Sequence, residues 1–177
     1  RSPMAEYVMK DLVKKAGLED EFQIASAATS REEIGNPGYP PARRKLAEHG
    51  IPCEGHAARQ LHNHDYEEYD LLIGMDKANL RNMYRICGGD FNDKMHLLME
   101  YAGRRKGPPR EPREAGRAGR GEARERSEFS PQAETEKSGL CFDEVADPWY
   151  TDDFDATWRD VLAGCQGLLD QIIIQEG

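Results

Sequence analysis

The stretch Val145-Ala-Asp-Pro-Trp-Tyr-Thr-Asp-Asp-Phe154 places an acidic residue, Asp147, before a proline, two adjacent aromatic residues and the start of a periodic helix. Proline fixes its own φ angle and disfavours the α region for the residue before it, so we expect Asp147 on an extended, rigid segment. Trp149 and Tyr150 are suited to line a cleft that receives a flat ring. A carboxyl group beside such a wall can acquire a raised pKa and act as a general acid. The alternative is that Asp147 only caps the following helix, with the aromatic residues packed beneath it.

From Asp153 onward the chain is predicted to be helical, because apolar residues recur on one face. These residues are Phe154, Trp158, Val161, Leu162, Cys165, Leu168, Leu169 and Ile172. The same patterns predict helices at residues 3–16, 41–49, 65–69 and 77–87, and strands at residues 22–28, 57–61, 70–75 and 95–99. Strands that alternate with helices predict an α/β fold with a parallel sheet.

The composition bounds the class of protein. A chain of 177 residues suffices for one domain, which we expect to span residues 1–177. No apolar run reaches the length of a membrane span, so no membrane partner is expected. The four cysteines, Cys53, Cys87, Cys141 and Cys165, have neither metal-type pair spacing nor a dense disulfide pattern, which favours the cytoplasm. The net charge of −9 argues against nucleic acid as a partner.

One segment does not fit a packed core. Residues 103–126 contain eight arginines, one lysine and four glutamates, with glycines and prolines throughout. Because this stretch carries +5 and the whole chain −9, the remainder carries −14. We expect residues 103–138 to form a disordered basic insert, since they cannot bury enough apolar surface to offset the entropy cost of ordering. Contact with RNA or acidic lipid is conceivable, but a solvated linker is the favoured interpretation.

The first residues, Arg1-Ser-Pro-Met-Ala-Glu6, resemble the end of the signature of the low-molecular-weight protein tyrosine phosphatase family. In that signature a cysteine and five further residues precede Arg-Ser-Pro and close a phosphate-binding loop. Further stretches agree with the family in order and spacing. They are residues 26–30 with 34–37, 50–52 with 56–60, 70–76 with 79–81, and Asp147-Pro-Trp-Tyr150. The resemblance covers the chain except the insert.

The resemblance implies a doubly wound, four-stranded parallel sheet, with the phosphate loop after the first and central strand. It also implies hydrolysis of phosphotyrosine in proteins through a phosphocysteine intermediate, with inorganic phosphate as product and no cofactor. The chemistry suits these groups. A thiolate at a helix N-terminus has a lowered pKa, backbone N–H groups and an arginine bind the phosphoryl oxygens, and an acid protonates the leaving oxygen.

The resemblance also assigns roles to single residues. Arg1 matches the phosphate-binding arginine, Ser2 the hydroxyl that hydrogen-bonds the thiolate, and Asp147 the general acid. Trp149 and Tyr150 match the aromatic pair that flanks the substrate ring. Ser26, His56 and Asp76 match polar residues that support the phosphate loop from beneath. Glu33 and Asn36 match positions that face the substrate. One extra residue near Glu54 makes the match of His56 less secure.

The nucleophile is the main departure from the family pattern. The cysteine should lie six residues before Arg1, and none of the four cysteines of this sequence precedes an Arg-Ser pair. The first strand is missing with it, which would leave unpaired edges inside the sheet. We therefore expect an N-terminally truncated copy of an enzyme, inactive by itself.

Other interpretations remain open. His56, His62 and His64 invite a metal hypothesis, but no nearby residue completes a recognisable ligand set, and the family uses no metal. Within the same fold, arsenate reductases and arginine-phosphate phosphatases are alternatives, although Trp149 and Tyr150 favour an aromatic substrate. A protein of a different class, a non-catalytic remnant that binds phosphate or a partner, is also kept as a hypothesis.

Overall fold

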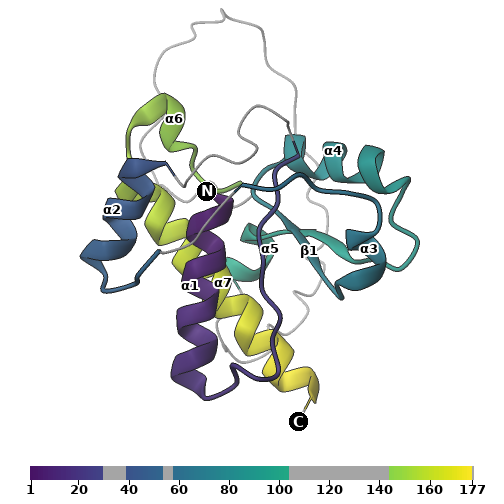
Figure 1. Cartoon of the computed structure of the whole chain (residues 1–177), viewed down its shortest axis with the longest axis horizontal. Coiled ribbons are helices and arrows are strands. Elements are labelled where there is room, and N and C mark those ends of the chain that lie inside the picture. Colours follow the sequence, from purple (N-terminus) through teal and green to yellow (C-terminus); the bar gives the residue numbers. More distant parts are fainter. Residues whose placement is uncertain (30–38, 54–57, 104–143, 177) are drawn as a thin grey trace, which may run out of the picture. The chain divides into compact units, whose positions relative to one another are not determined.

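The computed structural model describes residues 1–29, 39–53, 58–103 and 144–176. Along the chain it shows α1 (Ser2–Ala16), α2 (Pro40–Glu48), α3 (Asp65–Glu68), β1 (Leu72–Gly74), α4 (Lys77–Cys87), β2 (Met95–Leu97), α5 (Met99–Ala102), α6 (Pro148–Thr151) and α7 (Phe154–Glu176) (Figure 1). Every predicted helix is present within about one residue at its start. Residues 104–143, which hold nearly all of the expected basic insert, lie outside the described part.

The sheet confirms the parallel α/β class. β1 and β2 pair in parallel, with Leu72 opposite Met95 and Gly74 opposite Leu97. Parallel strands need a crossover connection, and α4 supplies it, packing against both strands. The strands predicted at residues 70–75 and 95–99 are longer than β1 and β2, because only the residues that lie opposite a partner strand form the hydrogen-bonded ladder.

The strand predicted at residues 22–28 is wrong for most of its length. Ala28 forms a single parallel bridge with Gln60, at the position of the strand predicted for residues 57–61, while residues 22–27 pair with no strand in the described part of the chain. Apolar character alone does not make a strand, since the backbone also needs hydrogen-bonding partners. Phe22 and Ile24 are instead partly buried against the main core.

Successive side chains of β1 pack into two different apolar clusters. In β1 the side chain of Leu72 enters a smaller cluster with Tyr66, Met83 and Met95, on the side of α4. Its neighbour Ile73 packs against the larger cluster, whose buried members come chiefly from α1, α2, α5 and α7. Successive side chains of a strand point to opposite faces, so the short sheet separates two layers of core.

The C-terminal helix α7 organises the larger cluster. The predicted apolar face is confirmed, since Trp158, Val161, Cys165, Leu168 and Leu169 are all buried. α7 packs against α1 and α5. Two glycines allow the close approach to α5: a Cβ atom at Gly164 would lie 2.5 Å from the Leu98 side chain, and one at Gly167 would lie 2.0 Å from the Tyr101 carbonyl oxygen.

Capping residues explain where α1 ends and where α4 begins. α1 ends at Gly17, which adopts the left-handed conformation (φ 72°) that glycine accepts without a Cβ clash. α4 begins after Asp76, whose carboxylate accepts the Asn79 N–H at 2.6 Å. None of the helices in the described part of the chain combines the length and apolar character that crossing a membrane requires.

The α5–α7 contact generates a prediction. In an open helix, Gly→Ala raises stability by about 1 kcal/mol. At Gly167 the added methyl group would meet backbone rather than a movable side chain, so we expect Gly167→Ala to lower the free energy of unfolding by about 1–3 kcal/mol. Urea unfolding measures the change. The exposed neighbour Gln166 provides the control, since Gln166→Ala should change the value by less than about 0.5 kcal/mol. A Gly167→Ala protein as stable as the parent would contradict the close packing.

Candidate active site

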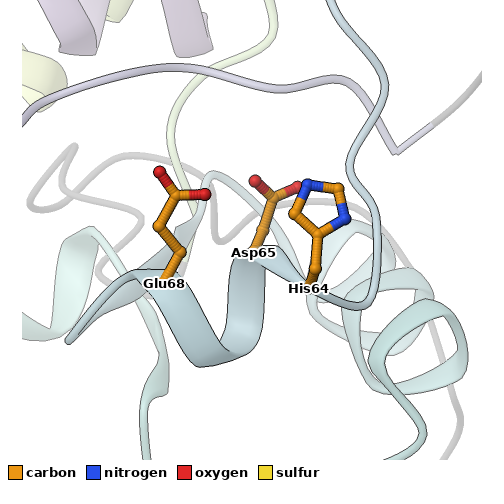
Figure 2. Close-up of side chains that lie close together, drawn as sticks. All are labelled: His64, Asp65 and Glu68. Atoms are coloured by element: carbon orange, nitrogen blue, oxygen red, sulfur yellow. The ribbon is translucent and has the colours of Figure 1, made fainter.

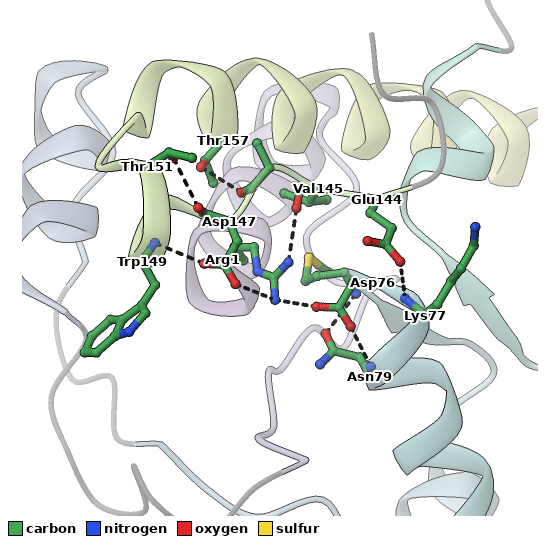
Figure 3. Close-up of polar contacts among 12 residues, drawn as sticks. Arg1, Asp76, Lys77, Asn79, Glu144, Val145, Asp147, Trp149, Thr151 and Thr157 are labelled. Carbon is green, nitrogen blue, oxygen red and sulfur yellow. Dashed lines mark hydrogen bonds and ion pairs between the residues drawn. The ribbon is translucent and has the colours of Figure 1, made fainter. Parts of the chain in front are cut away.

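Arg1 joins three segments that are far apart in the sequence. It is the N-cap residue of α1, and its guanidinium is largely buried. The Nη2 atom lies 2.5 Å from Asp76 Oδ2 and 3.3 Å from Asp147 Oδ2, and Nη1 donates to the Val145 carbonyl oxygen at 3.1 Å (Figure 3). Asp76 and Asp147, which the family resemblance assigned to the site together with Arg1, therefore both lie at the Arg1 guanidinium.

Asp76 is the fixed carboxylate of this group. It follows β1 and caps α4, so one oxygen accepts the Asn79 N–H while the other faces Arg1. Burial opposes its ionisation, but the Asn79 N–H and the Arg1 guanidinium outweigh that effect and hold the pKa of Asp76 below its usual value. Asp76 therefore stays ionised and anchors the arginine.

Asp147 adopts the predicted extended backbone, with φ −93° and ψ 107°. Its Oδ1 accepts the Trp149 N–H at 3.0 Å and so caps the short helix α6, while Oδ2 faces Arg1. The capping alternative raised by the sequence is thus partly confirmed. However, Trp149 is 70% exposed rather than packed beneath the turn. The carboxyl group of Asp147 is also the more accessible of the two, with 36% side-chain exposure against 15% for Asp76.

The backbone before Asp147 is held from both sides. The Val145 N–H donates to the Met75 carbonyl oxygen at 2.8 Å, which attaches this segment to the end of β1. The Ala146 peptide is bound by α7, since its N–H donates to Asp160 Oδ2 and its carbonyl accepts from Thr157 Oγ1, each at 2.9 Å. Sequence reasoning missed Thr157 and Asp160. Their spacing of one helical turn on the helix after the Asp-Pro segment was the available signal.

The aromatic side of the site contains a residue that the sequence did not indicate. Tyr39, the N-cap residue of α2, lies with its ring centroid 5.8 Å from that of Trp149 and 6.1 Å from that of Phe154. In the sequence Tyr39 follows Gly35-Asn-Pro-Gly38, a stretch without the periodicity that marks a buried face. Tyr150 belongs to α6, but its side chain lies outside the described part.

Of the remaining predicted site residues, the structure describes Ser2 and Ser26 but not Glu33, Asn36 or His56. Ser2 opens α1 directly after Arg1. Ser26 donates its hydroxyl to Glu6 Oε2 at 2.6 Å, which connects the segment before the Ala28 bridge to α1. Glu33, Asn36 and His56 lie outside the described residues. The support and substrate-facing roles of these residues stay predictions.

The described cysteines have the wrong environment for nucleophiles. Cys53, Cys87 and Cys165 are free thiols. Burial raises the pKa of each, to about 12 for Cys165. A thiol acts as a nucleophile in its thiolate form, which these environments disfavour.

A second polar cluster tests the metal hypothesis. His64, Asp65 and Glu68 place potential ligand atoms within 4.8 Å of one another on α3 and the residue before it (Figure 2). The Asp65 carboxylate, however, accepts both Arg59 contacts, at 2.9 and 3.0 Å, and the His62 N–H at 2.8 Å. Burial opposes its ionisation, yet these hydrogen bonds lower the pKa of Asp65. A carboxylate already neutralised by a guanidinium is a poor cation ligand, so this cluster is structural.

The geometry around Arg1 defines what the site can do. A guanidinium at a helix N-terminus binds phosphoryl oxygens well, because the fork of donors and the helix dipole both favour an anion. An accessible carboxyl group 3.3 Å from that cation can exchange a proton with a bound group. An exposed indole beside it offers a stacking surface for a flat ring.

Comparisons with known proteins identify the family of the chain. The family profile described as low molecular weight phosphotyrosine protein phosphatase matches residues 1–119. The chain is 28% identical over 172 residues to the low molecular weight protein-tyrosine-phosphatase YfkJ of Bacillus subtilis, which covers 97% of this chain and 88% of the relative. It is 40% identical over 103 residues to the Schizosaccharomyces pombe low molecular weight phosphotyrosine protein phosphatase, covering 58% of this chain and 65% of that protein.

Solved structures give the same result. The crystal structure of YfkJ from Bacillus subtilis superposes with a TM-score of 0.75 at 27% identity, covering all of this chain and 89% of that one. The low molecular weight protein tyrosine phosphatase SP-PTP of Streptococcus pyogenes has a TM-score of 0.67 at 28% identity, covering 97% of this chain and 84% of that one. Because the profile spans more than half of the sequence, the chain belongs to the low molecular weight phosphotyrosine protein phosphatase family.

Proposed function

We propose that this chain carries the phosphate-binding arginine and the general acid of a protein tyrosine phosphatase. In this proposal it hydrolyses phosphotyrosine in proteins, and the nucleophilic cysteine comes from residues that precede Arg1. The observation that carries the proposal is the placement of the Arg1 guanidinium within 3.3 Å of the Asp147 carboxylate. A binding group for phosphate and a proton donor for the leaving group must both be present at the reacting centre.

Two steps follow from these roles. The thiolate attacks phosphorus, an S–P bond forms, and the P–O bond to the phenol oxygen breaks as that oxygen takes the proton of Asp147. Water then attacks phosphorus and gives a proton to Asp147 while the S–P bond breaks, which releases inorganic phosphate. Arg1 holds two phosphoryl oxygens throughout both steps. Its positive charge stabilises the transition state most, because negative charge gathers on those oxygens there.

Asp76 and Asp147 have different roles beside Arg1. With both carboxyl groups ionised, Arg1 and its two partners carry a net charge of about −1, which repels a phosphate dianion. Asp76 is anchored by the Asn79 N–H and Arg1, so it keeps its charge. Asp147 is more exposed, so it is the carboxyl group that can reach the leaving oxygen of a bound ester.

The nucleophile and the full sheet are proposed together. The described residues contain two separate parallel pairings, β1 with β2 and Ala28 with Gln60. A central strand before Arg1, placed between the Ala28 segment and β1, would make a sheet of four parallel strands together with β2. It would end in a loop with a cysteine six residues ahead of Arg1. The raised pKa values of the thiols at Cys53, Cys87 and Cys165 support a nucleophile from outside this set.

An aromatic substrate fits the site better than arsenate. Trp149 follows the acid by two residues and leaves 70% of its surface open. A phenol ring gains stacking energy on an indole, whereas a small oxyanion gains none. The free thiols of the described cysteines support the cytoplasm as the place of action.

The nucleophile proposal gives the first prediction. The chain of residues 1–177 should not hydrolyse p-nitrophenyl phosphate above background. An extension that supplies a strand and a Cys-x5 loop ahead of Arg1 should restore turnover, and a Cys→Ser change in that extension should remove it again. Turnover by the unextended chain that disappears in Asp147→Ala would show that the nucleophile lies within residues 1–177. An extended, folded protein without turnover would favour the non-catalytic remnant.

The acid is tested by its dependence on the leaving group. In the extended protein, Asp147→Asn should lower the turnover of phenyl phosphate by about a hundredfold to ten-thousandfold. The loss in phenol release should be smaller for p-nitrophenyl phosphate, whose leaving group needs less protonation. Asparagine also caps helices well, so α6 should persist. Asp152→Asn, the same charge change on an exposed neighbour, is the matched control.

Arg1 should behave differently from Asp147. Arg1→Lys keeps the charge but loses the fork of donors, so it should weaken the binding of inorganic phosphate as well as turnover. Asp147→Asn should leave phosphate binding nearly unchanged. Equal turnover of phenyl phosphate by Asp147→Asn and the parent protein would reduce Asp147 to a structural cap.

A further inference from the structure

The ring of Tyr39 lies between the rings of Trp149 and Phe154. Its centroid is 5.8 Å from that of Trp149 at an interplanar angle of 52°, and 6.1 Å from that of Phe154 at 28°. The three residues come from the start of α2, from α6 and from the first residue of α7. They form one continuous row, which we call the aromatic row.

The row is anchored at one end and open at the other. Phe154 is partly buried against the main core, Tyr39 is 50% exposed, and Trp149 is 70% exposed. A centroid separation of 5.8 Å leaves no space for another ring between Tyr39 and Trp149. A ligand ring can instead stack on the exposed part of the indole that Tyr39 does not contact.

α2 is fixed to α7, so that Tyr39 has a defined position. Lys45 Nζ lies 2.6 Å from Asp155 Oδ1. At the other end of α2, the His49 ring stacks on Trp158 with centroids 3.7 Å apart and planes 3° from parallel. Pro40 follows Tyr39 as the first residue of the helix and restricts the backbone there. Tyr39 thus reaches the aromatic row from a helix that two contacts hold in place.

We infer that Tyr39 is a positioning residue for substrate recognition: it holds Trp149 as a stacking surface for the aryl group of the phosphate ester. The inference rests on the proposed function, because Trp149 lies beside Asp147. An exposed tryptophan without a neighbour samples several rotamers, and a ligand that stacks on it must fix one of them. The contact with Tyr39 restricts the indole before the ligand arrives, so more of the stacking energy becomes affinity.

The inference separates aryl from alkyl phosphate esters. Tyr39→Ala should weaken the binding of an aryl phosphate by about twofold to tenfold, the range that one aromatic pair provides. The binding of methyl phosphate, which has no ring, should not change. Tyr39→Phe keeps the ring and should keep the affinity, since the contact with Trp149 is one between rings.

The test is an NMR titration of residues 1–177 with p-cresyl phosphate and, separately, with methyl phosphate. The chain has two tryptophans, so the indole N–H signal of Trp149 reports on binding while that of the buried Trp158 is an internal reference. We expect p-cresyl phosphate to shift the Trp149 signal more than methyl phosphate does. The midpoint should move to higher concentration in Tyr39→Ala and be restored in Tyr39→Phe. Tyr84→Ala, which removes an exposed tyrosine from α4, should match the parent.

Two results would overturn the inference. One is an unchanged midpoint for p-cresyl phosphate in Tyr39→Ala, and the other is no aryl-dependent shift of Trp149 in the parent chain. In the extended protein, Tyr39→Ala should raise KM for p-cresyl phosphate and leave kcat nearly unchanged, whereas loss of the acid lowers kcat. A failure of the proposed function is recognised separately, because the extended protein would then show no turnover with any ester.

Discussion

The ion pair between Arg1 and Asp76 is the interaction on which the site depends. It places a guanidinium from the start of α1 against the carboxylate that caps α4, with both side chains largely buried. The same guanidinium donates to the Val145 carbonyl oxygen and faces the Asp147 carboxylate. Without this cation, two carboxylates would face each other at the end of β1, and Coulomb repulsion would push the Asp147 segment away. In the proposed function, Arg1 is therefore both a binding group for phosphate and the connection that keeps the acid in reach.

The fold brings these groups together through backbone contacts. The Val145 N–H continues the hydrogen bonding at the end of β1, and Thr157 and Asp160 of α7 bind the peptide before Asp147. α7 can take this place because Gly164 and Gly167 let it approach α5 closely. Core packing at one end of α7 thus sets the position of a carboxyl group at the other end, which is how a rigid scaffold orients a reactive side chain.

The sequence predicts the parts of this structure that local patterns specify. The apolar face of α7 and the extended backbone at Asp147 follow from spacing and from Pro148. Residues 22–27 were not predictable in the same way, because a strand depends on a partner elsewhere in the chain. Tyr39 was missed because its contacts with Trp149 and Phe154 join segments more than a hundred residues apart. The meeting of Arg1, Asp76 and Asp147 was expected from the family resemblance, while the distances between them come from the fold.

The coupling between Arg1 and Asp76 is the most direct measure of the central claim. A double-mutant cycle of Arg1→Gln and Asp76→Asn, read from the free energy of unfolding in urea, isolates that coupling from the other effects of each change. We predict a coupling of about 1–3 kcal/mol for this largely buried pair, and less than about 0.5 kcal/mol for the more exposed pair of Arg1 with Asp147. Effects of Arg1→Gln and Asp76→Asn that simply add would contradict the account, because Arg1 would then not hold the two segments together.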